Sequence, residues 1–122
     1  MKKKLLVVDD DSAVRRFMRR AVQGAGYEVV EAADGDQAVE LVGRERPDLV
    51  LLDMHMPRLD GIEALSAIMD LNPAMAVIMV TGDGDIERAK LAMERGACDY
   101  MSKPFDIQSL QTSVMANLLV RS

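Results

Sequence analysis

Five short segments, three of them unbroken apolar runs and two of them weaker strand candidates, are each followed by a stretch with helical periodicity, and this order constrains what the chain can fold into. The segments are residues 5–8, 27–32, 49–52, 77–80 and 98–102. The first, third and fourth do not alternate with polar residues, which is typical of strands covered on both faces. The second carries Glu28 and Glu31, which favour an edge position in a sheet. We therefore predict five strands, of which three are buried on both faces.

The stretches that follow these segments show the apolar spacing of amphipathic helices. Val14, Met18 and Val22 recur at four-residue intervals, and similar patterns follow the other strands. Gly26 and Gly96 stand where two of the helices should end. A (βα)5 order with short connections predicts an α/β fold, a doubly wound parallel sheet with helices on both faces. In such sheets the functional site lies at the carboxyl ends of the strands, where the strand order reverses.

Polar residues mark other helix ends. Asp34 with Gln37 resembles a capping pair that opens the second helix. The dipeptide Asn72-Pro73 should close the third helix, because the residue before a proline avoids helical geometry. Asp11 adjoins Ser12 and is expected to cap the first helix rather than to bind a ligand.

Length and composition limit the class of protein. At 122 residues the chain has room for one core, so we expect a single domain over residues 1–122 without an effector domain. A net charge of -5 argues against a nucleic-acid-binding face, which needs clustered Lys and Arg. The apolar run behind residues 2–4 has four residues, too few for a signal peptide, and no run approaches a membrane span. The single cysteine, Cys98, favours a reducing, cytoplasmic setting.

Ionisable and hydroxyl side chains gather where the predicted strands end. Asp9 and Asp10 follow the first strand, Asp53 the third, Thr81 the fourth and Lys103 the fifth. Two carboxylates about 4 Å apart repel by roughly 4 kcal/mol at an effective dielectric constant of about 20. Gathering Asp9, Asp10 and Asp53 is therefore costly unless a cation lies among them. Oxygen ligands with room for water suit Mg²⁺.

Asp53 can also act as a nucleophile, because an ionised carboxylate attacks phosphorus without a general base. The reaction needs neutralisation of the phosphoryl oxygens and correct placement. Lys103 supplies one positive charge, the metal supplies another, and Thr81 supplies a hydroxyl donor. The set is complete for phosphoryl transfer to a carboxylate.

These residues resemble the receiver domains of two-component response regulators, and the resemblance covers the whole chain. Its motifs are Asp9-Asp10, the run LLDMHMP at 51–57, Asp60-Gly61, Thr81-Gly82 and Lys103-Pro104-Phe105. One of these motifs alone is a weak signal, but five in this order and spacing are specific. The resemblance is to a chemotaxis-regulator-like single receiver, and it implies the flavodoxin-like strand order 2-1-3-4-5.

The resemblance implies a role for each strand-end residue. Asp53 corresponds to the phosphoacceptor. Asp10 corresponds to the direct ligand of Mg²⁺, and Asp9 binds the ion partly through water. The backbone carbonyl of His55 corresponds to the third protein ligand, and Lys103 pairs with a phosphoryl oxygen. Such a domain is not an enzyme in the usual sense, although it assists its own phosphotransfer and autodephosphorylation.

The resemblance also implies a conformational response. Thr81 and Tyr100 correspond to a switch pair, in which the hydroxyl turns to the phosphoryl group and the aromatic ring then moves inward. His55 and Asp83 occupy the two positions that tune the lifetime of the phosphoryl group. The bond between Lys103 and Pro104 is expected to be cis.

The expected partners are a sensor histidine kinase or a histidine phosphotransfer protein, and a downstream effector protein or domain. The effector surface is formed by the fourth helix, the fifth strand and the fifth helix, and this surface could also support a phosphorylation-dependent homodimer. A basic cluster on the first helix is either a solvated face or a docking surface for the phosphodonor. The cluster consists of Arg15, Arg16, Arg19 and Arg20. Neither nucleic acid nor membrane is an expected direct partner.

Three alternative functions have less support from the sequence. A phosphatase of the haloacid dehalogenase type would need a second Asp two positions after the nucleophile, where this chain has His55, and a longer chain for its cap. A receiver-like module that works without phosphorylation would typically lack the acidic pair, the acceptor or the lysine. Nucleotide binding through a P-loop is unsupported, because no Gly-rich loop ends in Gly-Lys-Ser/Thr. Because a chain that opens with Met1 ends with the domain, we expect a stand-alone regulator rather than part of a longer one.

Overall fold

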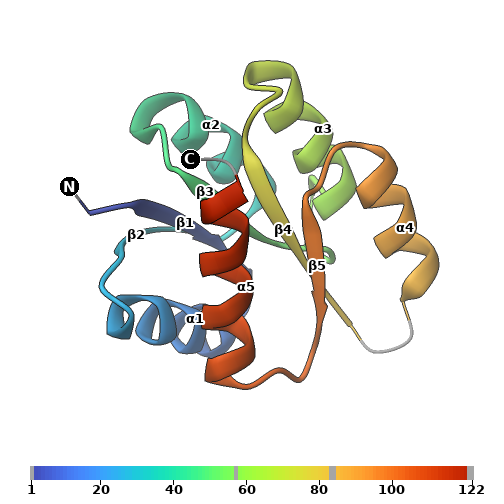
Figure 1. The fold of residues 1–122 in the computed structure, drawn as a ribbon. Helices are drawn as coiled ribbons and strands as arrows, with labels where there is room; N and C mark the ends of the chain where they lie inside the picture. The colour runs from blue at the N-terminus through green and yellow to red at the C-terminus, as the bar shows by residue number, and fades with distance from the viewer. Residues whose placement is uncertain (1, 57, 83–84, 121–122) are drawn as a thin grey trace.

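Strands and helices alternate along the chain, as the apolar pattern predicts. The computed structural model describes residues 2–56, 58–82 and 85–120 (Figure 1). The elements are β1 (Lys4–Val8), α1 (Ser12–Gly24), β2 (Glu28–Ala32), α2 (Gly35–Glu45), β3 (Leu49–Asp53), α3 (Gly61–Leu71), β4 (Ala76–Thr81), α4 (Ile86–Glu94), β5 (Asp99–Ser102) and α5 (Ile107–Val120). All five predicted strands are present, and no strand boundary differs from its prediction by more than one residue.

The five strands form one parallel sheet in the order β2-β1-β3-β4-β5. This confirms the doubly wound topology and the order that the receiver resemblance implies. β2 lies at one edge, as its two glutamates predict. The strand order reverses between β1 and β3, where Val8 pairs with Leu52. The next residue after Val8 and the last residue of β3 are Asp9 and Asp53, so the topology alone brings two carboxylates together.

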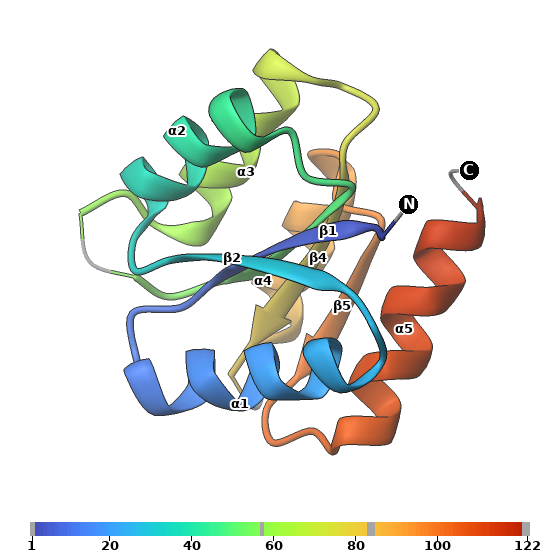
Figure 2. The same ribbon diagram turned by 90° about the vertical axis from the view of Figure 1, so that its left-hand side faces the viewer.

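Two hydrophobic cores cover the two faces of the sheet. Along β1, Leu5 and Val7 face α1 and α5, whereas Leu6 and Val8 face α2 and α3. α4 also contributes to the second of these cores through Ala92. Figure 2 shows α2 and α3 on one side of the sheet and α1 on the other. With both faces covered, successive residues of the central strands must all be apolar, which explains their unbroken runs.

An aspartate precedes each of the five helices, and the caps of α1, α2 and α3 show how these side chains act. Asp11 accepts hydrogen bonds from two amides in the first turn of α1, which confirms its predicted capping role. Asp34 caps α2 through the Gln37 amide, while the Gln37 side chain binds the amide of the residue before the cap. Asp60 and Glu63 form a reciprocal capping box at the start of α3. Such caps satisfy amides that have no partner within the helix.

Glycine and asparagine end the helices as predicted. Gly26 and Gly96 follow α1 and α4 with φ of 96° and 113°, a region that side chains rarely adopt. Asn72 is the C-cap of α3. No helix among the described residues is both long and apolar enough to cross a membrane.

α5 differs from the other helices in composition, because none of its residues from Ile107 to Val120 is charged. Its inner face, including Leu110 and Val114, lies in the core. Polar contacts also hold it to β5, where Asp99 accepts hydrogen bonds from Ser113 (2.9 Å) and from Asn117 (3.2 Å). Its outer face includes the exposed side chains of Met115 and Leu119.

Gly61 lets α3 approach the end of β3. Its amide donates to the Met54 carbonyl (2.9 Å). A Cβ atom at this position would lie 2.5 Å from the carbonyl oxygen of Asp53 and 2.6 Å from the Cα atom of Met54. Both neighbours are backbone atoms, so a side chain at this position would have to displace the backbone after Asp53.

We therefore expect Gly61→Ala to lower the free energy of unfolding by about 2 kcal/mol or more, because the added methyl group forces the β3–α3 loop away from the helix. The matched control is Gly43→Ala in α2, where a Cβ atom would meet no heavy atom within 4 Å. That change should raise the free energy of unfolding by about 0.5–1 kcal/mol, because alanine favours helix. Urea unfolding measures both, and equal stability of the two variants would contradict the close approach.

Candidate functional site

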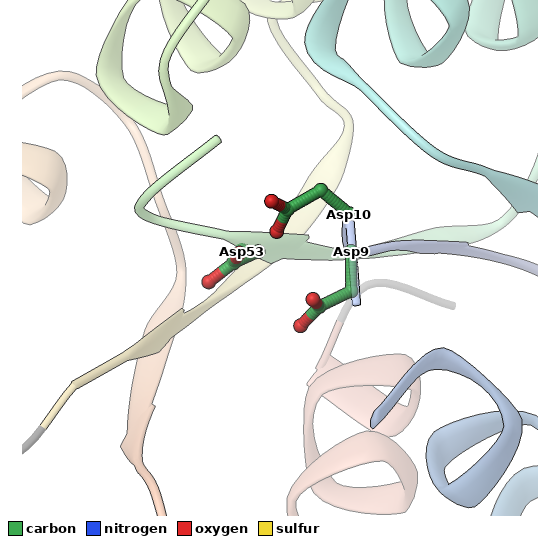
Figure 3. A group of neighbouring side chains, drawn as sticks. All are labelled: Asp9, Asp10 and Asp53. Carbon is green, nitrogen blue, oxygen red and sulfur yellow. The ribbon is translucent and has the colours of Figure 1, made fainter. Parts of the chain in front are cut away.

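Three carboxylates converge beyond the carboxyl ends of β1 and β3. One oxygen from each of Asp9, Asp10 and Asp53 lies within 4.8 Å of the others. Figure 3 shows Asp9 and Asp10 at the end of β1 and Asp53 on β3, with their three carboxylates directed to the same side. Asp9 is fully buried and Asp53 is 4% exposed, whereas Asp10 is exposed. The structure thus brings together the acidic residues that the sequence placed at separate strand ends.

Lys103 lies against this acidic cluster. Its Nζ atom is 3.0 Å from Oδ2 of Asp9 and 3.4 Å from Oδ1 of Asp53. Burial lowers the pKa of the Lys103 ammonium, but hydrogen bonds and charge from Asp9 and Asp53 outweigh burial and hold that pKa above its ordinary value. The lysine is therefore charged at neutral pH and bridges the two buried carboxylates.

The surroundings of Asp53 make its ionised form costly. Burial, followed by the negative charge of Asp9, raises the pKa of the Asp53 carboxyl from 3.8 to about 6. The charge of Lys103 and a backbone hydrogen bond from His55 act in the opposite direction. At neutral pH Asp53 is thus ionised, but it is held in a site that favours the arrival of a further positive charge.

No hydrogen bond joins Thr81 to Tyr100, two residues that the structure describes. Thr81 is buried at the end of β4, and its hydroxyl donates to the backbone carbonyl of Met101 (3.4 Å). Tyr100 on β5 is 42% exposed. The two residues predicted as a switch pair therefore sit on adjacent strands, with the hydroxyl directed to β5 and the ring outside the core.

His55 lies in the loop after β3 with its side chain largely exposed. Its Nε2 atom contacts Oδ2 of Asp85 at 2.5 Å, a contact that the sequence did not indicate. The role of its backbone carbonyl as a metal ligand stays a prediction. Asp83, the other lifetime-tuning candidate, lies outside the described residues. The bond between Lys103 and Pro104 is cis, as the receiver resemblance implies.

The donor set suits a hard divalent cation. All three acidic groups offer oxygen, and the exposed position of Asp10 leaves room for water. Mg²⁺ prefers oxygen ligands and keeps several waters. Asp9, Asp10 and Asp53 are thus the side chains that fit such an ion.

The basic cluster of α1 divides into two pairs. Arg15 and Arg19 bind the two carboxylate oxygens of Glu31 on β2, at 3.0 and 2.7 Å. Arg15 and Arg19 are therefore half-buried and paired with Glu31, whereas Arg16 and Arg20 are exposed. The four-residue spacing of Arg15 and Arg19 is the signal that was available, since it puts both on one side of the helix.

A parallel sheet with this strand order, an acidic cluster at the point of reversal and a lysine against it define the receiver class of protein. Comparison with known families agrees with this assignment. The family described as response regulator receiver domain matches residues 5–115. The chain belongs to this family, and it is a receiver domain of two-component signalling.

Individual relatives differ in length. Sporulation initiation phosphotransferase F of Bacillus subtilis is 38% identical over 122 residues, which cover 100% of this chain and 98% of that protein. Response regulator MprA of Mycobacterium leprae is 37% identical over 115 residues, 94% of this chain but 50% of that protein. The crystal structure of the receiver domain of NtrX from Brucella abortus superposes with a TM-score of 0.91 at 35% identity, covering 94% of this chain and 98% of that one.

The raised pKa of Asp53 has a consequence for stability. Between pH 3.8 and about 6, the folded chain keeps a proton on Asp53 that the unfolded chain has lost. The contribution of Asp53 to the free energy of unfolding therefore falls as the pH rises through this window and stays low above it. Asp53→Asn should accordingly raise the free energy of unfolding at pH 7.5, without divalent cations, by about 1–3 kcal/mol.

Urea unfolding across the pH range measures this difference, which should shrink as the pH falls toward 4. The control is Asp70→Asn, which removes an exposed carboxylate from α3 and should change the free energy of unfolding by less than about 0.5 kcal/mol. An Asp53→Asn variant that is less stable than the wild type at pH 7.5 would show that Lys103 outweighs the burial and repulsion at this site.

Proposed function

We propose that this chain accepts a phosphoryl group from a phosphohistidine donor onto Asp53, with Mg²⁺ bound, and that the modification changes a partner-binding surface. The observation that carries the proposal is the Lys103 ammonium, which lies between the buried carboxylates of Asp9 and Asp53. A nucleophile, a fixed cation and an acidic pair for a metal thus share one edge of the sheet.

In the proposed reaction, a bond forms between a carboxylate oxygen of Asp53 and the phosphorus atom. The bond between phosphorus and the donor imidazole nitrogen breaks, and the nitrogen keeps its electron pair and takes up a proton from solvent. Bound Mg²⁺ would supply positive charge at the phosphoryl oxygens. Lys103 would hold another of these oxygens, and the Thr81 hydroxyl would turn from Met101 to donate to a third. Asp9 and Asp10 would bind the metal, together with the His55 carbonyl.

The response would then pass from Thr81 to Tyr100. Rotation of the threonine hydroxyl frees space beside β5, into which the exposed tyrosine ring can move. This changes the α4–β5–α5 face, the surface that includes the exposed side chains of Ile86, Met93 and Tyr100. We propose this face as the site of effector binding, and of homodimer formation where phosphorylation induces it. Loss of the phosphoryl group by hydrolysis would reset the domain, at a rate set in part by His55 and Asp83.

The phosphodonor is proposed to dock beside the acidic site on the α1–α5 groove. This groove consists of two hollows of about 430 and 520 Å³ that share Phe17. The first is lined by Val14, Phe17, Lys103, Pro104 and Phe105, and the second includes Arg16, Arg20, Ile107 and Gln111. An apolar floor with basic residues at its rim suits a helix of opposite charge. The similarity to sporulation initiation phosphotransferase F, along nearly its whole length, supports a phosphotransfer role.

Intact mass measured after incubation with phosphoramidate tests the acceptor. Wild-type protein should gain one phosphoryl group in the presence of Mg²⁺. It should gain none when excess EDTA is present from the start, because the metal neutralises the phosphoryl oxygens. Asp53→Asn should gain none. Asp70→Asn, which removes an exposed aspartate far from the cluster, should behave like the wild type. No gain in the wild type with any small phosphodonor would overturn the proposal and favour a module that binds partners without phosphorylation.

Phosphotransfer from autophosphorylated histidine kinases tests the docking groove. The assay uses the kinase that phosphorylates the wild type fastest. Phe17→Ser should slow phosphotransfer from this kinase by about tenfold or more, because Phe17 forms part of both hollows. Its rate with phosphoramidate should not change. Met93→Ser provides the control, since Met93 on α4 is 40% exposed and Phe17 is 38% exposed. Equal slowing by both substitutions would count against a donor site on α1.

A further inference from the structure

Arg15 contacts the loop that carries the acidic pair. Its Nη1 atom donates to the backbone carbonyl oxygen of Asp9 at 2.7 Å. Its Nε atom donates to Oε1 of Glu31 at 3.0 Å, and Oε2 of the same carboxylate accepts from Arg19 at 2.7 Å. One guanidinium therefore joins α1, the edge strand β2 and the loop after β1.

This contact completes the set of hydrogen bonds around Asp9. The Asp9 amide donates to the Ala32 carbonyl (3.2 Å), and its Oδ1 atom accepts from the Asp11 amide (2.9 Å). Its Oδ2 atom accepts from Lys103 (3.0 Å). With Arg15 on the carbonyl, each backbone and side-chain polar atom of Asp9 has a partner, and the peptide that joins Asp9 to Asp10 is held in one orientation.

The guanidinium is itself held in place. The side chain of Arg15 is 20% exposed, and that of Glu31 is 30% exposed. Burial raises the pKa of the Glu31 carboxyl, but hydrogen bonds and charge from Arg19 and Arg15 outweigh burial and keep that pKa below its ordinary value. Glu31 is thus ionised over the neutral range. Its Oε1 atom holds Arg15, while Arg19 holds the other carboxylate oxygen and so fixes the orientation of the Glu31 carboxylate.

We propose that Arg15 is a positioning residue for the divalent-cation site: by holding the Asp9 carbonyl, it sets the direction in which the Asp10 carboxylate projects toward Asp9 and Asp53. The role rests on the proposed function, because it assumes that these aspartates bind Mg²⁺. Asp10 is the exposed member of the cluster, and its carboxylate forms no hydrogen bond or ion pair with any other residue that the structure describes. The orientation of its backbone therefore decides where its oxygens lie.

The sign of the effect separates positioning from simple electrostatics. Arg15 is a positive charge near a cation site, so its removal should strengthen Mg²⁺ binding if charge alone matters. If Arg15 positions the ligands, its removal should weaken binding despite that gain. Groups that orient metal ligands typically change affinity by about tenfold or more.

The test is the Mg²⁺ dissociation constant of the unphosphorylated protein, measured from amide chemical shifts in NMR titrations at constant ionic strength. Arg15→Gln should weaken Mg²⁺ binding by about tenfold and should shift the amides of Asp10 and Asp11 before metal is added. Arg19→Gln is the matched control. It removes the same charge from the same Glu31 cluster but leaves the Asp9 carbonyl bound, so its affinity should stay within about twofold of the wild type.

The outcomes are distinct. Binding by Arg15→Gln as tight as that of Arg19→Gln overturns the positioning role while leaving the metal site intact. Absence of Mg²⁺ binding by the wild type overturns the proposed metal site and, with it, this role of Arg15. If Arg15→Gln does not fold, Arg15→Lys replaces it. Lysine keeps the charge but has a single nitrogen, which cannot reach the carbonyl and Glu31 as the guanidinium does, so Mg²⁺ binding should again be weaker than in the wild type.

Discussion

The placement of one ammonium group between two buried carboxylates makes the rest of the site tenable. Asp9 is fully buried and Asp53 nearly so, and the sheet on which they sit is apolar on both faces. Lys103 offsets part of their desolvation and mutual repulsion. With Asp10 included, three carboxylates and one ammonium leave two negative charges in excess when all are ionised. A dication would match this excess, so its binding would relieve the repulsion among these carboxylates.

Topology brings these groups together from distant parts of the sequence. The reversal of strand order puts β1 beside β3, so Asp9 and Asp53 become neighbours without any special loop. Lys103 follows β5, which lies at the opposite edge of the sheet from β2. The Lys103 amide donates to the Thr81 carbonyl (2.7 Å), and this hydrogen bond carries the β5–α5 loop over the end of β4. The close packing of Gly61 against the backbone after Asp53 then holds the acceptor loop from the helical side. Each of these restraints is backbone geometry, independent of the ligand.

Much of this could be predicted from the sequence, because it depends on patterns with a short period. Unbroken apolar runs reveal strands with two covered faces, and aspartates or glycines at helix ends act locally. Contacts between separate elements were harder. The contacts of Arg15 with Glu31 and of His55 with Asp85 join residues 16 and 30 positions apart, where charge alone suggests many equivalent partners. The exposed state of Tyr100 also depends on how β5 packs, which its own sequence does not specify.

The uncharged composition of α5 distinguishes two faces of the molecule by their response to salt. A partner on the outer side of α5 would meet Met115 and Leu119 but no ionic group of that helix, so added salt should have little influence on those contacts. A partner on the α1–α5 groove meets Arg16 and Arg20, whose long-range attraction fades as the Debye length shortens. Ionic strength in the cell would therefore act mainly on encounters at α1, while contacts made with the outer side of α5 would be set by shape and apolar area.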